Sequence, residues 1–220
     1  VEMQRTDEIY RSSKHIKQGQ TSIAPEFINL QAWIESAYGI KPFNIEHKEI
    51  NTSNGIRPII TLVFDTAEDT KKFYEPSSFR YNQNTRIEND IVQKCKELIS
   101  KKYNQNNLGI SYAEFHTPAR EETISKISET ELKELISKWN DPRVWNLVVS
   151  FGTITLFFYT EVERKTITNH TLDMWKNDIY KLVKKYDEFD VFDKDTSFIL
   201  NDSKEIFDNN YNSNWEYYFR

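Results

Sequence analysis

The chain has 220 residues, 38% hydrophobic and 14% aromatic, which is enough for one large domain or two small ones. Its 5 glycines nearly exclude Gly-rich phosphate-binding loops, and a single cysteine, Cys95, excludes an intramolecular disulfide framework. The net charge of −5 is uneven, because residues 1–110 carry 15 basic and 14 acidic side chains (+1) and residues 111–220 carry 14 and 20 (−6). Bulk charge therefore gives no strong nucleic-acid signal, whereas the acidic C-terminal half suits a basic protein partner.

The same composition bears on the compartment. No run of about 18 apolar residues is present, so the sequence predicts no membrane span. The lack of cysteine pairs favours a reducing compartment, and we expect a soluble, cytoplasmic protein. Because the chain begins with Val1 rather than Met, an exported or membrane-anchored form whose leader has been removed is the alternative.

The N-terminal half is expected to contain a helix, a hairpin, a second helix and a strand. Residues 1–22 are polar with little periodicity and are predicted to be an arm. Pro25 suits the first turn of a helix that Gly39 can end. The two strands of the hairpin are predicted next, at 43–50 and 56–65. The second helix, with Cys95 in its apolar stripe, is predicted at 86–103, and the last strand at 109–116.

The C-terminal half is predicted to repeat this order after a polar connector at 118–127. Ser128 and Glu131 have the spacing of a capping box, and apolar residues at helical spacing continue to Trp139. A hairpin, a helix beginning at Thr171 and two strands follow. The hairpin is predicted over 143–165 and the strands at 198–200 and 215–219, with an Asn- and Asp-rich loop at 201–214.

The hairpin from Arg143 to Lys165 is the clearest local pattern. Gly152-Thr153 is predicted to form a type II′ turn, which would place Phe151 opposite Ile154. Alternation then puts Trp145 and Leu147 on one face, and both faces near the turn are apolar. The sequence therefore predicts that this pair of strands is covered on both sides.

The shared order of elements predicts an α+β fold made by tandem duplication of an αββαβ unit, with mainly antiparallel sheets and packed helices. The halves are 23–117 and 128–220, and they are able to form one compact domain. ITLVF at 60–64 resembles ITLFF at 154–158, and ENDI at 88–91 resembles KNDI at 176–179. A groove between the halves would be the first place to seek a small ligand.

One triplet suggests metal-dependent chemistry. Glu163-Arg164-Lys165 at the end of the hairpin is similar to the E-x-K element of restriction-endonuclease-like nucleases. The resemblance implies a divalent metal held by acidic groups and a lysine that assists the attacking water. On a strand, Glu163 and Lys165 would share a face, with Asp141 upstream. The acid expected on the first hairpin strand is missing, since Asn146 is the residue that stands there, and a solvated strand end is the alternative interpretation.

Two further segments suggest interaction surfaces. Acidic residues gather near the end of the last predicted helix, where they form a docking surface or a solvated loop. They are Asp187, Glu188, Asp190, Asp193 and Asp195. The final aromatic segment, Trp215 to Phe219, is predicted to be a core strand, and exposed aromatics there would instead indicate a protein interface.

No motif for a cofactor is present, and no two histidines have metal-ligand spacing on a helix. The leading hypothesis is thus a non-enzymatic protein- or ligand-binding module, for example an immunity or inhibitor protein for a basic partner. The alternatives are a metal-dependent hydrolase or nuclease that uses the E-x-K triplet, and a small-ligand-binding domain with a pocket between the halves. The oligomeric state is not predicted.

Overall fold

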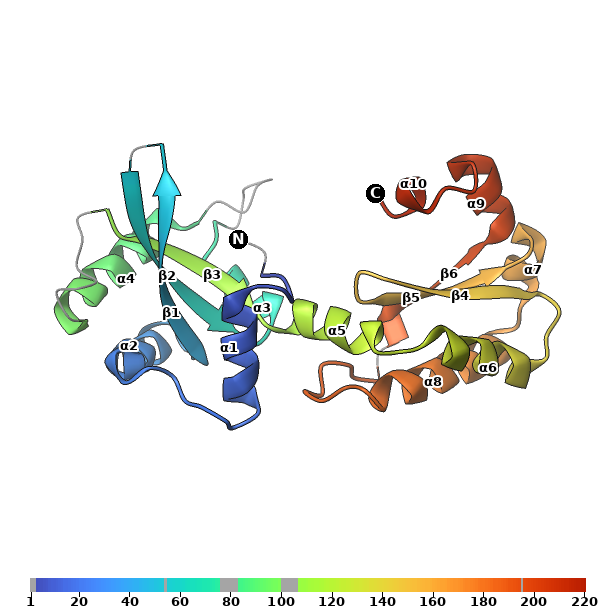
Figure 1. Cartoon of the computed structure of the whole chain (residues 1–220), viewed down its shortest axis with the longest axis horizontal. Coiled ribbons are helices and arrows are strands. Elements are labelled where there is room, and N and C mark those ends of the chain that lie inside the picture. Colours follow the sequence, from blue (N-terminus) through green and yellow to red (C-terminus); the bar gives the residue numbers. More distant parts are fainter. Residues whose placement is uncertain (1–2, 54, 76–82, 100–106, 195) are drawn as a thin grey trace. The chain divides into compact units, whose positions relative to one another are not determined.

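The computed structural model describes residues 3–53, 55–75, 83–99, 107–194 and 196–220. They form the predicted α+β fold, with two three-stranded sheets (Figure 1). The chain divides into two compact units, unit 1 over Val1–Pro118 and unit 2 over Ala119–Arg220. None of the helices in these described ranges is both long and apolar enough to cross a membrane.

Unit 1 is built on the sheet β1-β2-β3. Strand β2 is antiparallel to β1 and parallel to β3, so the sheet is mixed. The parallel pair follows from the helical crossover that joins β2 to β3. The elements are α1 Glu8–Lys17, η1 Pro25–Phe27, α2 Ile28–Tyr38, β1 Asn44–Thr52, β2 Gly55–Phe64, α3 Ala67–Lys71, α4 Thr85–Leu98 and β3 Gly109–Glu114, followed by α5 His116–Ser125.

The core of unit 1 lies between the sheet and helices α2 and α4. Ile34 from α2, Ile60 from β2 and Ile91 from α4 are fully buried there. Cys95 lies in the same core, and burial raises the pKa of its thiol to about 12, so it is an inert thiol at neutral pH. We call the sheet face that points away from α2 and α4 the outer face of unit 1.

The predicted arm at 1–22 is wrong, because residues 8–17 form helix α1. Tyr10 is buried and stacks on Phe115 with ring centroids 5.3 Å apart. The Asn44 amide donates hydrogen bonds to the hydroxyls of Ser12 at 3.1 Å and Ser13 at 3.0 Å. Ring stacking and these hydrogen bonds together hold α1 on the outer face. The helix is amphipathic although its sequence is polar on average, and the prediction of an arm overlooked its apolar side.

The connector predicted at 118–127 is also mostly helical. Helix α5 spans His116–Ser125, and Ala119 and Ile124 are buried. Pro118 lies in its first turn, where the missing backbone N–H breaks no helical hydrogen bond. The proline therefore begins a helix here and does not mark a loop.

Unit 2 is built on the sheet β4-β5-β6, which is antiparallel in its first pair and parallel in its second. Figure 1 shows α6 and α8 on one side of this sheet, and α9 and α10 on the other, which we call the outer face of unit 2. The elements are α6 Glu129–Trp139, β4 Val144–Ser150, β5 Thr153–Phe158, α7 Glu161–Thr166, α8 Asn169–Lys184, η3 Thr196–Phe198, β6 Ile199–Ser203, α9 Lys204–Tyr211 and α10 Trp215–Tyr218.

The two units share their order of elements. In each, a helix precedes an antiparallel hairpin, a short helix and a longer helix follow, and the third strand joins parallel to the second. The short helices α3 and α7 both begin with a capping box two residues after the preceding strand, at Thr66 with Asp69 and at Thr160 with Glu163. The tandem duplication itself stays a prediction.

The hairpin of unit 2 turns one residue earlier than predicted. Phe151 and Gly152 both have positive φ, 44° and 74°, as a type I′ turn requires. Ser150 therefore pairs with Thr153, and the predicted pairing of Phe151 with Ile154 is wrong. A register shift between Val144 and Asn146 turns Trp145 toward Phe157, away from the Leu147 face where the sequence had placed it.

The C-terminal segment is helical where a loop and a strand were predicted. The Ser203 hydroxyl accepts a hydrogen bond from the Ile206 backbone N–H at 3.2 Å and begins α9. The Asn214 side chain accepts from the Glu216 N–H at 2.8 Å and begins α10. These caps outweigh the strand-like alternation of the aromatic residues. Helix α8 begins after its N-cap residue Thr168, which lies three residues before the predicted cap Thr171.

Candidate interaction surfaces

The E-x-K triplet lies on helix α7 and not at a strand end. Glu163 completes the capping box by accepting from the Thr160 N–H at 2.8 Å, and Lys165 forms an ion pair with Glu161 at 3.2 Å. Residues i and i+2 of a helix point about 200° apart, so Glu163 and Lys165 do not share a face. The strand needed by the nuclease interpretation is therefore absent at this position.

Asp141, the third residue of that interpretation, is held by Arg143. The guanidinium donates two hydrogen bonds to the carboxylate, at 2.9 Å and 2.6 Å, and they lower the pKa of Asp141. In turn, the Asp141 carboxylate raises the pKa of Arg143, and Glu163 adds a smaller contribution in the same direction. A guanidinium thus stands where a metal would be needed, and no group of three His, Cys, Asp or Glu residues in the described part of the chain is arranged to hold a metal ion.

The predicted acidic docking surface is partly used inside unit 2. The Asp187 side chain is fully buried and accepts from the backbone N–H groups of Val191 at 2.9 Å and Phe192 at 3.0 Å. Lys184 pairs with Asp187 at 2.7 Å and also with Asp190. Although burial acts in the opposite direction, these two carboxylates raise the pKa of Lys184 to about 12. Asp187 therefore anchors a turn and offers no charge to a partner.

The remaining acidic residues of this set are more exposed. Glu188 lies 4.0 Å from the Lys126 ammonium, and Asp193 is exposed. Asp195 lies outside the described residues. The acidic segment is therefore a loop in which some of the carboxylates are already paired. Unit 2 has two other surfaces with more clearly defined geometry.

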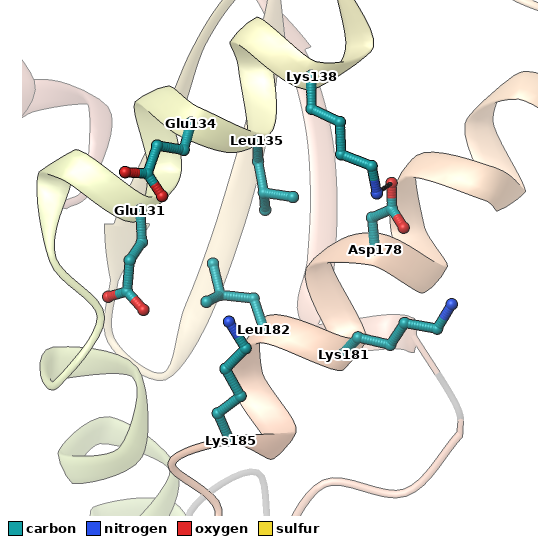
Figure 2. Close-up of a pocket in the computed structure, with 8 residues that line it drawn as sticks. All are labelled: Glu131, Glu134, Leu135, Lys138, Asp178, Lys181, Leu182 and Lys185. Atoms are coloured by element: carbon teal, nitrogen blue, oxygen red, sulfur yellow. Dashed lines mark hydrogen bonds and ion pairs between the residues drawn. The ribbon is translucent and has the colours of Figure 1, made fainter.

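One of these is an open groove between α6 and α8, with a volume of about 270 Å³ (Figure 2). Leu135 and Leu182 face each other across its middle. Charged side chains surround them on both helices. The groove is lined by Glu131, Glu134, Leu135, Lys138, Asp178, Lys181, Leu182 and Lys185.

Several of the charges in the groove are already neutralised. Asp178 accepts from the Lys138 ammonium at 2.8 Å and from the Trp139 indole N–H at 3.1 Å. Although partial burial acts to raise it, these donors lower the pKa of Asp178. Glu131 accepts from the Tyr186 hydroxyl at 2.7 Å.

Glu134, Lys181 and Lys185, by contrast, make no ion pair within the described ranges. Lys181 and Lys185 nevertheless lie near enough to interact electrostatically with Asp178 and Glu131, respectively. Nothing in the sequence analysis indicated this groove, although both helices were predicted. The i, i+4 spacing of Lys181 and Lys185 is the signal that points to it.

The second surface is aromatic and lies on the outer face of unit 2. Its lower layer is buried: Phe157 from β5 is fully buried, and Phe207 from α9 is 3% exposed. Trp215 stacks on Phe207 with ring centroids 4.0 Å apart. The Tyr218 hydroxyl donates to Asp202 at 2.6 Å, which ties α10 to strand β6.

Above this layer the rings form a row that reaches solvent. Trp145, Trp215 and Phe219 follow one another at centroid distances of 6.1 and 5.7 Å with nearly parallel planes, and all three are half-buried. Phe151 meets Phe219 edge-on at 6.4 Å and is 73% exposed. We call these four residues the aromatic surface. Tyr217 is 50% exposed and lies beside the Arg220 guanidinium, outside this row.

The sequence favoured a core strand for Trp215 to Phe219, with a protein interface as the alternative if its aromatic residues were exposed. The segment is helical, and Tyr217 is 50% exposed. Trp145 and Phe151 were missed, because the register shift and the earlier turn move both side chains. The Phe-Gly pair between two β-rich runs, read as the centre of a type I′ turn, would have placed Phe151 at the tip.

In comparisons with known proteins, no family model matches this chain, and no curated protein matches its sequence.

Proposed function

We propose that this protein is a binding module that recognises a partner protein through the aromatic surface of unit 2. The observation that supports the proposal is Phe151, which has a φ of 44° and a side chain that is 73% exposed. A positive φ costs a residue with a Cβ about 1–2 kcal/mol, and an exposed ring recovers little of this by burial. The turn requires the positive φ, but it does not require a phenylalanine at this position, and a partner that buries the ring would offset the cost of having one there.

The rest of the row suits the same role. Tryptophan, tyrosine and phenylalanine are enriched at the buried centres of protein interfaces, where a few of them contribute most of the binding energy. Trp145 and Trp215 are held by ring stacking, with planes 7° apart. A partner would therefore immobilise few additional rotamers on binding them.

A basic partner is part of this proposal. Residues 111–220 carry 14 basic and 20 acidic side chains, a net −6. Partly exposed tryptophan and tyrosine faces also attract arginine and lysine side chains. An immunity or inhibitor protein directed against a basic protein is one form that such a module takes.

Site-specific photocrosslinking tests the proposal. A benzoylphenylalanine placed at Phe151 is expected to crosslink a partner in an extract of the source cells. The matched control carries the same group at Ser53, which lies exposed at the tip of the unit 1 hairpin. Excess unlabelled protein should abolish the crosslink from position 151.

Two outcomes would contradict the proposal. One is the absence of any crosslinked protein from position 151. The other is the same set of crosslinked proteins from positions 151 and 53, because nonspecific contact at any exposed hairpin tip would explain it.

A further inference from the structure

Strand β4 is an edge strand of unit 2 and carries no charge. In the order β4-β5-β6, no described strand lies beyond it. Charged residues and side-chain caps on an edge strand discourage pairing with another chain, and the other edge strands of the two sheets have them. Strand β1 contains three charged residues, β6 contains Asp202, and the Ile110 carbonyl of β3 accepts from the Gln83 amide at 3.1 Å. The seven residues of β4 include no such protection.

The main-chain groups of Leu147 and Val149 point away from β5. In a hairpin with a two-residue type I′ turn, the flanking residues Ser150 and Thr153 form a hydrogen-bonded pair, and the two kinds of pair then alternate along the strands. Leu147 and Val149 therefore occupy the positions whose N–H and C=O groups are directed outward. The Leu147 N–H agrees with this, because it donates to the Asn146 side chain at 2.9 Å and not to β5. The free edge of β4 thus offers a short ladder to a further strand.

The residue types along this edge are the same in both directions from Val148. On either side comes an aliphatic residue, Leu147 or Val149, and then a polar one, Asn146 or Ser150. An antiparallel copy of the strand centred on Val148 pairs Leu147 with Val149 of the partner subunit, and these are the residues with outward hydrogen-bonding groups. Val148 then faces Val148 of the partner subunit. A closed dimer requires a surface that is complementary to itself, and this edge has that property.

We propose that a second copy of the chain pairs with this edge, β4 to β4, about a twofold axis that passes beside Val148 perpendicular to the sheet. The two three-stranded sheets join into one sheet of six strands. Because the axis is perpendicular to the sheet, both outer faces stay on the same side, and the dimer presents two aromatic surfaces on one face. The contacts are main-chain hydrogen bonds and aliphatic side chains, so association depends little on ionic strength.

Sedimentation velocity of the purified chain over a series of concentrations measures the dimer. Val148→Lys and Val148→Glu should each raise the dissociation constant at least about tenfold, because the axis places two like charges opposite each other. An equimolar mixture of the two variants should associate at least about tenfold more tightly than either variant alone, because each lysine then meets a glutamate. Leu200→Lys is the matched control, because Leu200 is 49% exposed on β6, the other edge strand of the same sheet.

Amide hydrogen exchange measures the ladder itself. The Val149 N–H points outward, so its exchange should slow as the protein concentration rises and the dimer fills. The Glu49 N–H on β1 is the control. Glu49 is paired with Pro58, which has no N–H to donate, so this is also a pair without hydrogen bonds and its N–H also points away from the neighbouring strand. Its exchange should not change with concentration.

The opposite results overturn the inference. A wild-type chain that stays monomeric at every concentration excludes the dimer. A mixture that associates no more tightly than Val148→Lys alone rejects the pairing centred on Val148, and the edge is then left to a foreign strand. Equal weakening by Leu200→Lys, or unchanged exchange at Val149, places the interface elsewhere. Because these measurements use the purified chain alone, their outcome is independent of whether the aromatic surface has a foreign partner.

Discussion

The outer faces of the two sheets are closed in different ways. In unit 1 the polar residues Asn44, Glu46 and Thr61 lie on the face. Hydrogen bonds from the Asn44 amide to Ser12 and Ser13 attach α1 to it, together with the stacking of Tyr10 on Phe115. In unit 2 the same face is aromatic, and α9 and α10 are attached by the rings of Phe207 and Trp215. The strand order and strand directions are identical in the two sheets.

This difference shows where the scaffold leaves room for recognition. In unit 1 the one aromatic ring that α1 contributes, Tyr10, is buried, and hydrogen bonds supply the rest of the attachment. A helix attached by ring stacking needs only apolar area, so a row of rings is able to continue past the helix into solvent. Phe151 is that continuation, and the described residues of unit 1 show no exposed aromatic ring of this kind on their outer face.

The largest expected effect comes from removing the lower aromatic layer of unit 2. Phe207→Ala should lower the free energy of unfolding by about 3–5 kcal/mol, because it opens a cavity beneath Trp215 and Trp145. Urea denaturation followed by tryptophan fluorescence measures the loss. A loss of unfolding free energy below about 1 kcal/mol would show that α9 and α10 are only loosely attached. It would contradict the conclusion that aromatic packing covers the outer face of unit 2.

A smaller effect is expected from the polar closure of unit 1. Asn44→Ala should cost about 1–3 kcal/mol, because it leaves the buried Ser13 hydroxyl without its donor. Hydrogen exchange should then quicken in residues 8–17 and not in α9 or α10. Lys48→Ala on the same strand, where the side chain is exposed, is the control. Equal exchange rates in the two variants would show that α1 is held by other contacts.

The Tyr218 phenol is expected to contribute to the loss of stability at high pH. Burial, together with Asp202, raises the pKa of its phenol above the ordinary value of 10.0. Because the folded-state pKa is raised, the contribution to stability is full below pH 10.0 and is lost as the pH rises toward the folded value. Tyr218→Phe should therefore flatten the decline in unfolding free energy above pH 10.0. It should also cost on the order of 1 kcal/mol at neutral pH. A decline of the same steepness in the variant would exclude Tyr218 as its source.

The smallest change in stability, and one of opposite sign, is expected at the hairpin tip. Phe151→Asn places a residue that tolerates positive φ before Gly152, which is the preferred pair for a type I′ turn. It loses the edge contact with Phe219 but relieves the strain, so the free energy of unfolding should stay unchanged or rise by up to about 1 kcal/mol. Thermal unfolding measures this, with Ser53→Asn in the other hairpin as control. A clear loss of stability would mean that Phe151 serves folding, and the functional argument would fail.

Much of the fold was predictable from local patterns. The capping box at Ser128 and the αL residue Gly39 mark helix ends in the structure as they do in the sequence. The segments that were missed have local patterns that compete. In 201–219, alternating aromatic residues favour a strand, whereas the Ser203 and Asn214 caps begin helices that pack on the sheet. Such competition is decided by tertiary contacts, which a single sequence does not show.

The candidate surface was predictable only in part. The aromatic content of 215–219 was visible, but exposure depends on which rings the sheet covers. A one-residue change in the turn places Phe151 at the hairpin tip, and one register shift turns Trp145 to the outer face. Because side chains alternate along a strand, errors of a single residue reverse the face of every neighbour. The sequence therefore shows that aromatic residues are present, but it does not show which of them lie on the surface.

Partner binding by Phe151→Asn decides whether the exposed ring takes part in recognition. Once crosslinking has identified the partner, titration calorimetry with purified proteins gives the dissociation constant of each variant. We predict that Phe151→Asn raises this constant at least about tenfold, as removal of an interface anchor does, without reducing the free energy of unfolding. An unchanged dissociation constant would contradict the account, because the exposed and strained ring would then have no part in recognition.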